Sequence, residues 1–417
     1  MGFGIMANPL LEDRRSVLSN AGDIASATRI GESQAIELDV EGVVMPSPRD
    51  ARLLEPLAMI RPSMTYKMGY GHAWIPDDQA RCARRCGLRR IMVTQIGEPR
   101  ESLAVHEVPE LQPEAGEVLV EMLAIPIHPA DLLVMRGRHV FTPSYPCGTG
   151  IEGAGRVVGH GPGVSQPGIG QRVALPFGGT WAEQVTLPAA SVIPLPDDVD
   201  LHQGAMVALN PVTALGLLMG MKPGQWLLHN AANSSLARLI TRVAADKGIH
   251  SISVVRRAGM EAELKANGAD HVLVDGEDLP QRVHAILGGR GVDRALDAVA
   301  GRASGRMFDS VADFGTLICY GLLGGDEVII PAAQLIFRDV QVRGYSRLRY
   351  LRSLSREDAE LLHADLFAGL EKGLFHTPIL STFAFADIAQ AVELAESSSG
   401  AGKVLLIPPG VREREGA

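Results

Sequence analysis

Hydrophobic and polar residues follow two different periods in the two main parts of the chain. From Ile91 onward, short stretches alternate apolar and polar positions, and Gly and Pro lie densely between them. From about residue 226, short apolar runs alternate with stretches whose apolar residues recur at helical spacing. The first pattern predicts a compact all-β unit, a barrel or sandwich. The second predicts a parallel sheet with helical crossovers, so we expect a chain of the α/β class.

The same pattern gives approximate bounds for the elements. Strands of the β unit are expected at residues 91–95, 103–108, 117–127, 153–159, 172–175 and 182–186. After helical spacing at 201–220, strands near 226, 252, 272, 293, 315 and 340 alternate with helices at about 235–247, 259–267, 279–287 and 302–312. A helix at 356–372, a strand at 380–384, a helix at 385–397 and a strand at 403–407 follow. This tail is expected to rejoin the β unit.

Residues 1–90 differ from the rest of the chain. They mix Ser, Pro, Gly and scattered charges, and they show no sustained period of either kind. They lack the layout of a signal peptide and carry more acidic residues than a typical transit peptide. We interpret residues 1–90 as an N-terminal extension that is disordered or not part of the main fold.

One stretch, residues 226–257, has the strand–helix–strand layout of a dinucleotide-binding unit. An apolar strand leads through a polar turn to an amphipathic helix and then to a β-branched strand. The usual G-x-G-x-x-G window falls on Ala232, Ser234 and Ala237. These residues are small, so backbone N–H groups at the helix start can still meet a phosphate. An ordinary βα turn without a ligand is the alternative interpretation.

The end of the second strand indicates which dinucleotide this unit prefers. A site for NAD has an acidic residue about twenty residues after the turn, where it binds the ribose 2′-hydroxyl. Arg256 and Arg257 occupy that place here. Guanidinium groups bind phosphate through paired hydrogen bonds, so two arginines suit the 2′-phosphate of NADPH. NADPH is therefore the predicted cofactor, and a solvated basic corner is the alternative.

Composition excludes several classes of function. The chain of 417 residues has a formal net charge of -9, which argues against a general nucleic-acid partner. No apolar run approaches the roughly twenty residues of a membrane span. Four cysteines make neither a disulfide framework nor a complete zinc set. We expect a cytoplasmic protein with no metal, no membrane contact and no nucleic-acid partner.

Several short motifs follow one another along the chain. They are His128-Pro129-Ala130-Asp131, Gly150-Ile151-Glu152-Gly153, Gly179-Thr180-Trp181-Ala182-Glu183, Asn210-Pro211-Val212-Thr213-Ala214, Asn230-Ala231-Ala232-Asn233-Ser234, Leu335-Ile336-Phe337-Arg338-Asp339 and Gly402-Lys403-Val404. In this order they resemble the medium-chain dehydrogenase/reductase superfamily over roughly residues 91–408. Within it they are most similar to the zinc-independent quinone oxidoreductases and the mitochondrial-type 2-enoyl thioester reductases.

The resemblance implies two domains and a class of reaction. A GroES-like β-barrel domain would comprise residues 91–208 and 346–410, and a Rossmann domain with a doubly wound parallel sheet would comprise residues 209–345. Zinc-dependent members use a Cys and a His-Glu pair as ligands, but the matching places here hold His128 and Ile151. Without a Lewis acid, a simple ketone is harder to polarise. A double bond conjugated to a carbonyl remains reducible, because charge spreads onto the carbonyl oxygen.

The resemblance also implies candidate site residues. Asn210 is expected beside the nicotinamide ribose and is a catalytic candidate, although it also suits a plain helix cap before Pro211. Trp181 is expected to wall the substrate pocket, with a buried structural role as the alternative. For Lys403, a surface lysine is the alternative. The predicted cofactor-binding residues are Asn210, Thr213, Asn233, Ser234, Ser235, Leu236, Arg256, Arg257, Tyr320, Gly321 and Lys403.

The proton donor is where the chain departs from the family pattern. Enoyl thioester reductases of this type carry a tyrosine in the loop that follows the H-P-A-D motif. Alignment by Gly137 and Pro143 puts His139 in that place, with Tyr145 a little beyond. Both are catalytic candidates, because a histidine can donate a proton near neutral pH or stabilise an enolate oxygen. A solvated loop histidine is the alternative, and the departure fits a quinone reductase at least as well.

The predicted function is an NADPH-dependent, zinc-independent reductase of activated double bonds. Its expected substrates are enoyl thioesters of coenzyme A or acyl-carrier protein, enones or quinones. One alternative is a related reductase or dehydrogenase of another carbonyl compound. Another is an NADPH-binding protein that has lost catalysis. Residues 328–343 contain strand-forming residues at an expected sheet edge, and the resemblance implies a homodimer there.

Overall fold

The computed structural model of the chain describes residues 86–138, 143–398, 402–409 and 411. All of them belong to one of the two units into which the chain divides, the one that runs from Arg52 to Ala417. Most of the predicted extension therefore lies outside the described residues. The first strand, β1, begins at Cys86, earlier than the alternation of apolar residues predicts.

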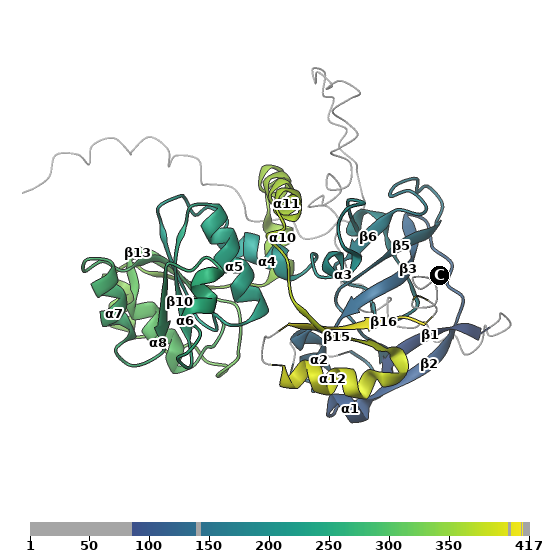
Figure 1. The fold of residues 1–417 in the computed structure, drawn as a ribbon, viewed down its shortest axis with the longest axis horizontal. Coiled ribbons are helices and arrows are strands. Elements are labelled where there is room, and N and C mark those ends of the chain that lie inside the picture. The colour runs from purple at the N-terminus through teal and green to yellow at the C-terminus, as the bar shows by residue number, and fades with distance from the viewer. Residues whose placement is uncertain (1–85, 139–142, 399–401, 410, 412–417) are drawn as a thin grey trace, which may run out of the picture. The chain divides into compact units, whose positions relative to one another are not determined.

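The β-rich part contains a three-stranded and a seven-stranded sheet within the described residues (Figure 1). The smaller sheet has the order β2-β1-β4, formed by Leu103–Pro109, Cys86–Val93 and Cys147–Gly148. The larger sheet has the order β15-β16-β3-β5-β6-β8, and β7 also pairs with β3. Its strands are β3 (Glu117–Pro126), β5 (Gly153–His160), β6 (Arg172–Leu175), β7 (Gln184–Pro188), β8 (Ile193–Pro194), β15 (Ile379–Ala384) and β16 (Lys403–Ile407).

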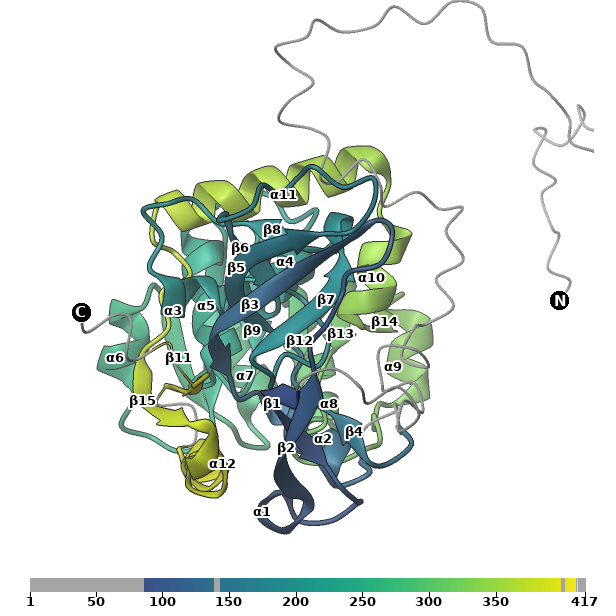
Figure 2. The same ribbon diagram turned by 90° about the vertical axis from the view of Figure 1, so that its right-hand side faces the viewer.

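The C-terminal tail returns to this sheet as predicted. Leu405 and Leu406 of β16 pair antiparallel with Pro126 and Ile125 of β3, although more than 250 residues separate the strands in sequence. Figures 1 and 2 show the yellow tail lying against the strands of the β-rich part. The short helices of this part are α1 (Pro99–Ser102), α2 (Pro129–Met135), α3 (Leu201–Gly204) and α12 (Ile388–Ser397).

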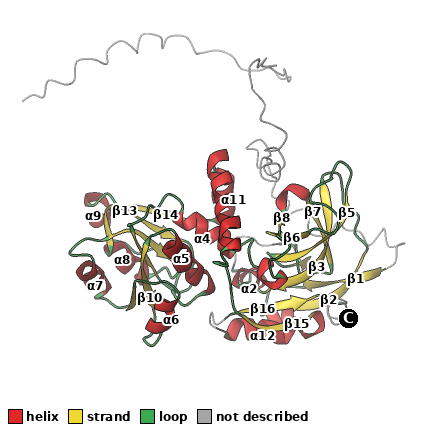
Figure 3. Ribbon diagram, turned by 45° about the horizontal axis from the view of Figure 1, so that its top comes forward, coloured by secondary structure: helices red, strands yellow, loops and turns green. Residues whose placement is uncertain are grey.

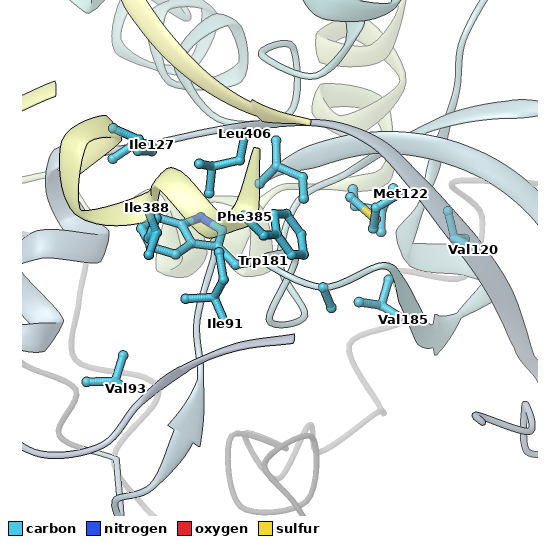
Figure 4. Close-up of a cluster of buried hydrophobic side chains, with 14 of the residues drawn as sticks. Ile91, Val93, Val120, Met122, Ile127, Trp181, Val185, Phe385, Ile388 and Leu406 are labelled. Carbon is cyan, nitrogen blue, oxygen red and sulfur yellow. The ribbon is translucent and has the colours of Figure 1, made fainter. Parts of the chain in front are cut away.

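A hydrophobic core holds the β-rich part together. Trp181 and Phe385 lie at its centre, in contact with apolar side chains from β1, β3 and β16 (Figure 4). Strand β3 alternates between half-buried and buried residues over its first half and is fully buried over its second half. A second apolar cluster covers the other face of β3 along its second half, where Leu123 and Ala124 pack against Leu195 and Ala205.

The second part is an open parallel sheet of six strands with the order β11-β10-β9-β12-β13-β14. This is the doubly wound order, in which the chain reverses direction across the sheet between β9 and β12. The strands are β9 (Trp226–His229), β10 (His250–Val255), β11 (His271–Val274), β12 (Val292–Asp297), β13 (Val311–Cys319) and β14 (Gln341–Gly344). The helices are α4 (Asn210–Leu218), α5 (Ser235–Asp246), α6 (Glu261–Ala266), α7 (Leu279–Ile286), α8 (Arg302–Asp309), α9 (Ala332–Phe337), α10 (Arg347–Ser353) and α11 (Arg356–Glu371).

Helices cover both faces of this sheet (Figure 3). The side chains of successive strand residues point to opposite faces, so Leu227 and Leu228 enter different clusters. Leu227 packs with Leu239 and Val243 of α5, and Leu228 packs with residues of α7 and α8. The sheet is therefore buried on both sides, which explains the continuous apolar runs that predicted it.

Two details differ from the sequence-based expectation. The helical spacing at 201–220 belongs to two helices, because α3 ends at Gly204 and α4 begins at Asn210. Helices α10 and α11 lie in the segment predicted to belong to the β-barrel domain, but Leu362 and Leu366 of α11 pack in the cluster of Leu227. An apolar helix face needs a partner, and here α4 and α5 supply it. Within the described residues, no helix is long and apolar enough to cross a membrane.

Candidate functional site

The carboxyl ends of β9 and β12 meet where the strand order of the parallel sheet reverses, which is where open α/β sheets bind ligands. From β9 the chain passes through a tight turn into α5. Ser234 caps this helix, since its Oγ accepts a hydrogen bond from the backbone N–H of Ala237 at 3.3 Å. Ser235 is the first residue of the helix. The free N–H groups of this helix end form a binding place for a phosphate.

The turn keeps a glycine-like shape without glycine. Ala231 has φ of 49°, a left-handed conformation that costs an L-residue roughly 1–2 kcal/mol. Hydrogen bonds fix the turn, from Ser234 N to Ala231 O at 2.9 Å and from Ala232 N to Val254 O at 3.1 Å. Of the other predicted turn residues, Asn233 is half-buried and Leu236 packs against the cluster of α4 and β9.

Arg256 and Arg257 directly follow β10 and are exposed. Strand β10 is parallel to β9, so both arginines leave the sheet at the same edge as the turn before α5. Among the described residues neither side chain forms an ion pair. By contrast, Arg238 of α5 is paired with Glu263. The two guanidiniums are thus available to an anion at the edge where a dinucleotide ribose would lie.

Tyr320 and Gly321 follow β13 at the same edge. The backbone N–H of Tyr320 donates to Asp297 O at 2.8 Å, and its hydroxyl has no hydrogen-bond partner among the described residues. Burial raises the pKa of this hydroxyl, and the charge of Asp297 adds to the rise. A Cβ at Gly321 would lie 2.6 Å from Ala298 O, so only glycine allows this close approach of two backbone segments.

A second set of polar side chains comes from α2 and from the start of α4. His128 caps α2, and its Nδ1 accepts a hydrogen bond from Ala130 N at 3.1 Å. Its backbone N–H donates to Asp131 Oδ2 at 2.9 Å. Because Nδ1 is an acceptor, the proton of the neutral ring is on Nε2, which faces Asn210 Oδ1 at 3.4 Å. The oxygen of the Asn210 amide is thereby engaged, and its NH2 group is the end left to donate.

Asn210 is not the plain helix cap that the sequence allows as an alternative. It is the first residue of α4, Leu209 occupies the cap position, and no side chain caps the helix. Asn210 and Thr213 are both nearly fully buried. The Thr213 hydroxyl donates to Leu209 O at 2.7 Å. Its proton is thus engaged, and toward a ligand the hydroxyl oxygen can act only as an acceptor.

Four titratable side chains form what we call the ionisable group: the half-buried His128 and the buried Asp131, Glu152 and Lys403. Burial lowers the pKa of His128 well below its usual range, and the charge of Lys403 lowers it further, so the ring is neutral. Burial also lowers the pKa of Lys403, and the carboxylates of Glu152 and Asp131 oppose that change. Lys403 is 6% exposed, so the alternative of a surface lysine is wrong.

Both carboxyl groups of the ionisable group are hard to ionise. Burial raises the pKa of Asp131 to about 7, against the hydrogen bond from His128, while Glu152 raises it and Lys403 lowers it. Burial raises the pKa of Glu152 to about 7, against the charges of Lys403 and Arg347. The N–H of Leu209 also lowers that pKa, although neither Glu152 oxygen makes a hydrogen bond of normal geometry to the described residues. Perturbed titratable groups of this kind gather at functional sites.

Three other predicted site residues have different positions. Trp181 has no exposed surface and lies in the core of the β-rich part, which supports the structural alternative over a pocket wall (Figure 4). The Tyr145 hydroxyl donates to Val134 O at 3.1 Å, and burial raises its pKa, so the phenol is engaged in local structure. His139 lies outside the described residues, and its catalytic role stays a prediction.

The donor set does not suit a tetrahedral zinc ion. Such an ion takes thiolate, imidazole or carboxylate ligands. Here His128 uses Nδ1 as an acceptor and faces an amide through Nε2, and the neighbour of Glu152 is the apolar Ile151. No set of three His, Cys, Asp or Glu side chains among the described residues could hold a metal ion.

Sequence reasoning missed the buried partners of the site. His128, Asp131 and Glu152 stand in motifs that carry the family resemblance, but nothing in their spacing shows that Lys403 of β16 lies with them. Asn230 was quoted only as part of a motif, with no role of its own, and Asp297, a single polar residue at the end of an apolar strand, was missed. A signal was present, since a polar residue at such a strand end faces the ligand edge of a parallel sheet.

Comparison with known proteins gives matches to both parts of the chain. The family described as alcohol dehydrogenase GroES-like domain matches residues 114–197, and the family described as zinc-binding dehydrogenase matches residues 267–406. The mitochondrial enoyl-[acyl-carrier-protein] reductase of Bos taurus is 27% identical over 329 residues, which cover 76% of this chain and 88% of the relative.

Solved structures match over the same region. A mycobacterial quinone oxidoreductase has a TM-score of 0.70 and 28% identity, and the match covers 77% of this chain and 100% of that chain. A mycobacterial protein solved in complex with NADPH has a TM-score of 0.69 and 28% identity, with the same coverage of 77% and 100%.

Proposed function

The chain belongs to the medium-chain dehydrogenase/reductase superfamily, and from this premise we propose that it reduces a carbonyl-conjugated double bond or a quinone with NADPH as its cofactor. The relatives include an enoyl-[acyl-carrier-protein] reductase and a quinone oxidoreductase, and the predicted function names both classes. The observation that carries the proposal is the exposed pair Arg256–Arg257, which has no ion-pair partner among the described residues and lies beside the turn of a doubly wound sheet.

The residues at the sheet edge fit NADPH. The twelve-residue helix α5 directs free N–H groups at the place of a pyrophosphate, and Ala232 and Ala237 are small enough to allow close approach. The two arginines supply positive charge for a 2′-phosphate, and no carboxylate stands at the end of β10 to favour a free ribose hydroxyl. When bound, NADPH supplies the hydride of the reduction.

The chain itself has to orient the substrate and supply hydrogen-bond donors. His128 holds the Asn210 amide through its oxygen, which leaves the NH2 group to donate toward a ligand oxygen or the nicotinamide ribose. A fixed, nearly buried donor stabilises developing negative charge better than water does. The candidate proton donor is His139, with Tyr145 less suited because its hydroxyl is bound to Val134 O.

The alternatives of the sequence analysis remain separate proposals. A reductase or dehydrogenase of another carbonyl compound would use the same cofactor edge. A protein that binds NADPH without turnover would keep Arg256 and Arg257 but lack a working proton donor. Location in the cytoplasm also stays a prediction, which fractionation of cells that express the native protein would test.

We also propose that two copies of the chain associate along β14. This strand is the outer strand of the sheet, where its backbone is open for pairing. The predicted edge at 328–343 contains helix α9 as well as this strand, and exposed apolar side chains gather on it, namely Val328, Ile329, Ile336 and Phe337. Light scattering should give the mass of a dimer, and a monomer would reject the proposal.

One screen tests the proposed reaction. NADPH oxidation by the purified full chain is followed with a crotonyl thioester, an enone and a quinone, each also with NADH. We expect turnover with at least one of these substrates and a strong preference for NADPH. Asn210→Ala should lower turnover about a hundredfold to a thousandfold, since removal of one stabilising donor costs that order. NADPH binding without oxidation in any assay would favour the non-catalytic alternative.

A further inference from the structure

Asn230 joins the two loops that leave the sheet where its strand order reverses. It follows β9, is 4% exposed, and both ends of its side-chain amide reach the end of β12. Its Nδ2 donates to Asp297 Oδ1 at 2.6 Å, and its Oδ1 accepts from the backbone N–H of Ala298 at 2.7 Å. One buried side chain thus links the turn before α5 to the loop after β12 by two short hydrogen bonds.

Asp297 continues this link into its own loop. Its Oδ1 also accepts from Val299 N at 2.8 Å and Ala300 N at 3.1 Å, and its Oδ2 accepts from the Ser304 hydroxyl at 2.5 Å. Asp297 has no exposed surface. A buried carboxylate that accepts this many hydrogen bonds fixes the groups around it, because any rearrangement leaves a buried polar atom unpaired.

Both loops contain an alanine in the left-handed region that favours glycine. Ala231 follows Asn230 directly and has φ of 49°, and Ala300, bound by Asp297, has φ of 66°. Such strained backbone persists where the surrounding contacts determine it, and it gathers at binding sites. The loop after β12 in turn holds the loop after β13, since Leu323 N donates to Ala298 O at 3.1 Å and Gly324 N to Val299 O at 2.7 Å.

We propose that Asn230 and Asp297 are positioning residues that hold the loops after β9 and β12 in the shape that binds NADPH. The usual dinucleotide turn reaches its shape through glycine, which adopts left-handed backbone freely. In this chain the side-chain link from Asn230 to Asp297 holds Ala231 and Ala300 in the left-handed conformation instead. The link orders the free protein before the ligand arrives, so less of the binding energy is spent on ordering loops. This inference rests on the proposed NADPH binding.

The test compares NADPH dissociation constants for the full chain and for Asn230→Ala, measured by titration calorimetry. We expect the variant to bind NADPH about tenfold to a hundredfold more weakly, the range for lost hydrogen bonds to a buried charged group. Turnover at saturating NADPH should stay within about threefold of the wild type, because a positioning residue does not touch the reacting atoms. Unchanged affinity in the folded variant would overturn the inference.

A rescue separates positioning from general loss of stability. In Asn230→Ala/Ala231→Gly, glycine adopts the left-handed turn without the side-chain link, so part of the lost NADPH affinity should return. No recovery would contradict the role assigned to the link. Ser310→Ala is the matched control, because it removes one hydrogen bond of a buried side chain, from the Ser310 hydroxyl to Arg306 O at 2.8 Å, at the amino end of β13 and away from the two loops. It should lower the melting temperature and leave NADPH affinity unchanged.

If Asn230→Ala does not fold, Ser304→Ala takes its place, since it removes a single hydrogen bond to Asp297 Oδ2 and should weaken NADPH binding about threefold to tenfold. Equal affinity of folded Ser304→Ala and wild type would then overturn the inference. If the wild type itself does not bind NADPH, the proposed function fails, and that result differs from wild-type binding that the variants leave unchanged.

Discussion

Two buried carboxylates of this chain, Asp297 and Glu152, differ in whether hydrogen bonds compensate for their removal from water. Asp297 and Glu152 both have no exposed surface. Asp297 accepts hydrogen bonds at both oxygens, whereas neither oxygen of Glu152 has a partner of normal geometry among the described residues. A satisfied buried group fixes geometry, and an unsatisfied one has a charge that depends on pH and on nearby ions. The chain thus combines a cofactor edge, the loops after β9 and β12, whose polar groups are fixed by hydrogen bonds, with an ionisable group whose charge depends on pH.

The largest expected effect is at the satisfied carboxylate. Asp297→Ala would leave the buried N–H groups of Val299 and Ala300 and the amide of Asn230 without their acceptor. We expect the free energy of unfolding to fall by about 3–5 kcal/mol, the cost of breaking a buried charged network from one side. Urea unfolding measures this change. A loss below about 1 kcal/mol would remove the distinction between the two carboxylates.

The unsatisfied carboxylate should respond to pH. Burial raises the pKa of Glu152 from 4.5 to about 7, so between these values the folded state binds more protons than the unfolded state. The contribution of Glu152 to the free energy of unfolding is therefore fully present below pH 4.5 and is lost as pH rises from 4.5 to about 7. Glu152→Gln does not titrate, so relative to wild type it should gain ~1–3 kcal/mol as pH rises from about 4 to 8.

Urea unfolding at several pH values checks this expectation. Glu371→Gln, at the exposed end of α11, is the control and should follow the pH dependence of the wild type. A constant difference between Glu152→Gln and wild type across the range would mean that Glu152 does not titrate in this window. The ionisable group would then be as fixed as the cofactor edge.

The smallest expected effect sharpens the account of the cofactor edge. Ala231 is left-handed, whereas its neighbour Ala232 is not and is fully buried beside Val255 and Leu264. Ala231→Gly should stabilise the protein by up to about 1 kcal/mol, since relief of strain outweighs the added chain entropy. Ala232→Gly should destabilise it by about 1–2 kcal/mol through lost burial and added entropy. Melting temperatures of the two variants should move in opposite directions, and a common direction would contradict the assigned backbone shape.

Much of the fold was predictable from the sequence, because local patterns determine it. The alternation of strands and helices from residue 226 to 345 predicted the doubly wound sheet, and the predicted bounds of α5 and β16 agree with the structure within a residue. The tail was correctly expected to rejoin the β-rich part. The packing of α11 with α4 and α5 was not predicted, because an amphipathic pattern shows that a helix is buried but not against which core.

Site residues could be predicted from the sequence only where they directly follow a predicted strand. Arg256 and Arg257 stand at the end of β10 and lie at the expected edge. Trp181, by contrast, is a core residue, and its motif could not show which way the ring points. The meeting of Lys403 with Glu152, and of Asn230 with Asp297, depends on pairing between distant strands. No period along the chain encodes such contacts.

Residues 226–257 are proposed to bind NADPH without the usual glycines. The most direct test is calorimetric titration of NADPH and NADH into the wild type and Arg256→Ala/Arg257→Ala, with exposed Arg290, at the amino end of β12, changed to Ala as the control. We predict that the double variant binds NADPH about tenfold to a hundredfold more weakly and NADH almost unchanged, because only NADPH carries the 2′-phosphate. Equal loss of both cofactors, or no loss of NADPH affinity, would contradict the account.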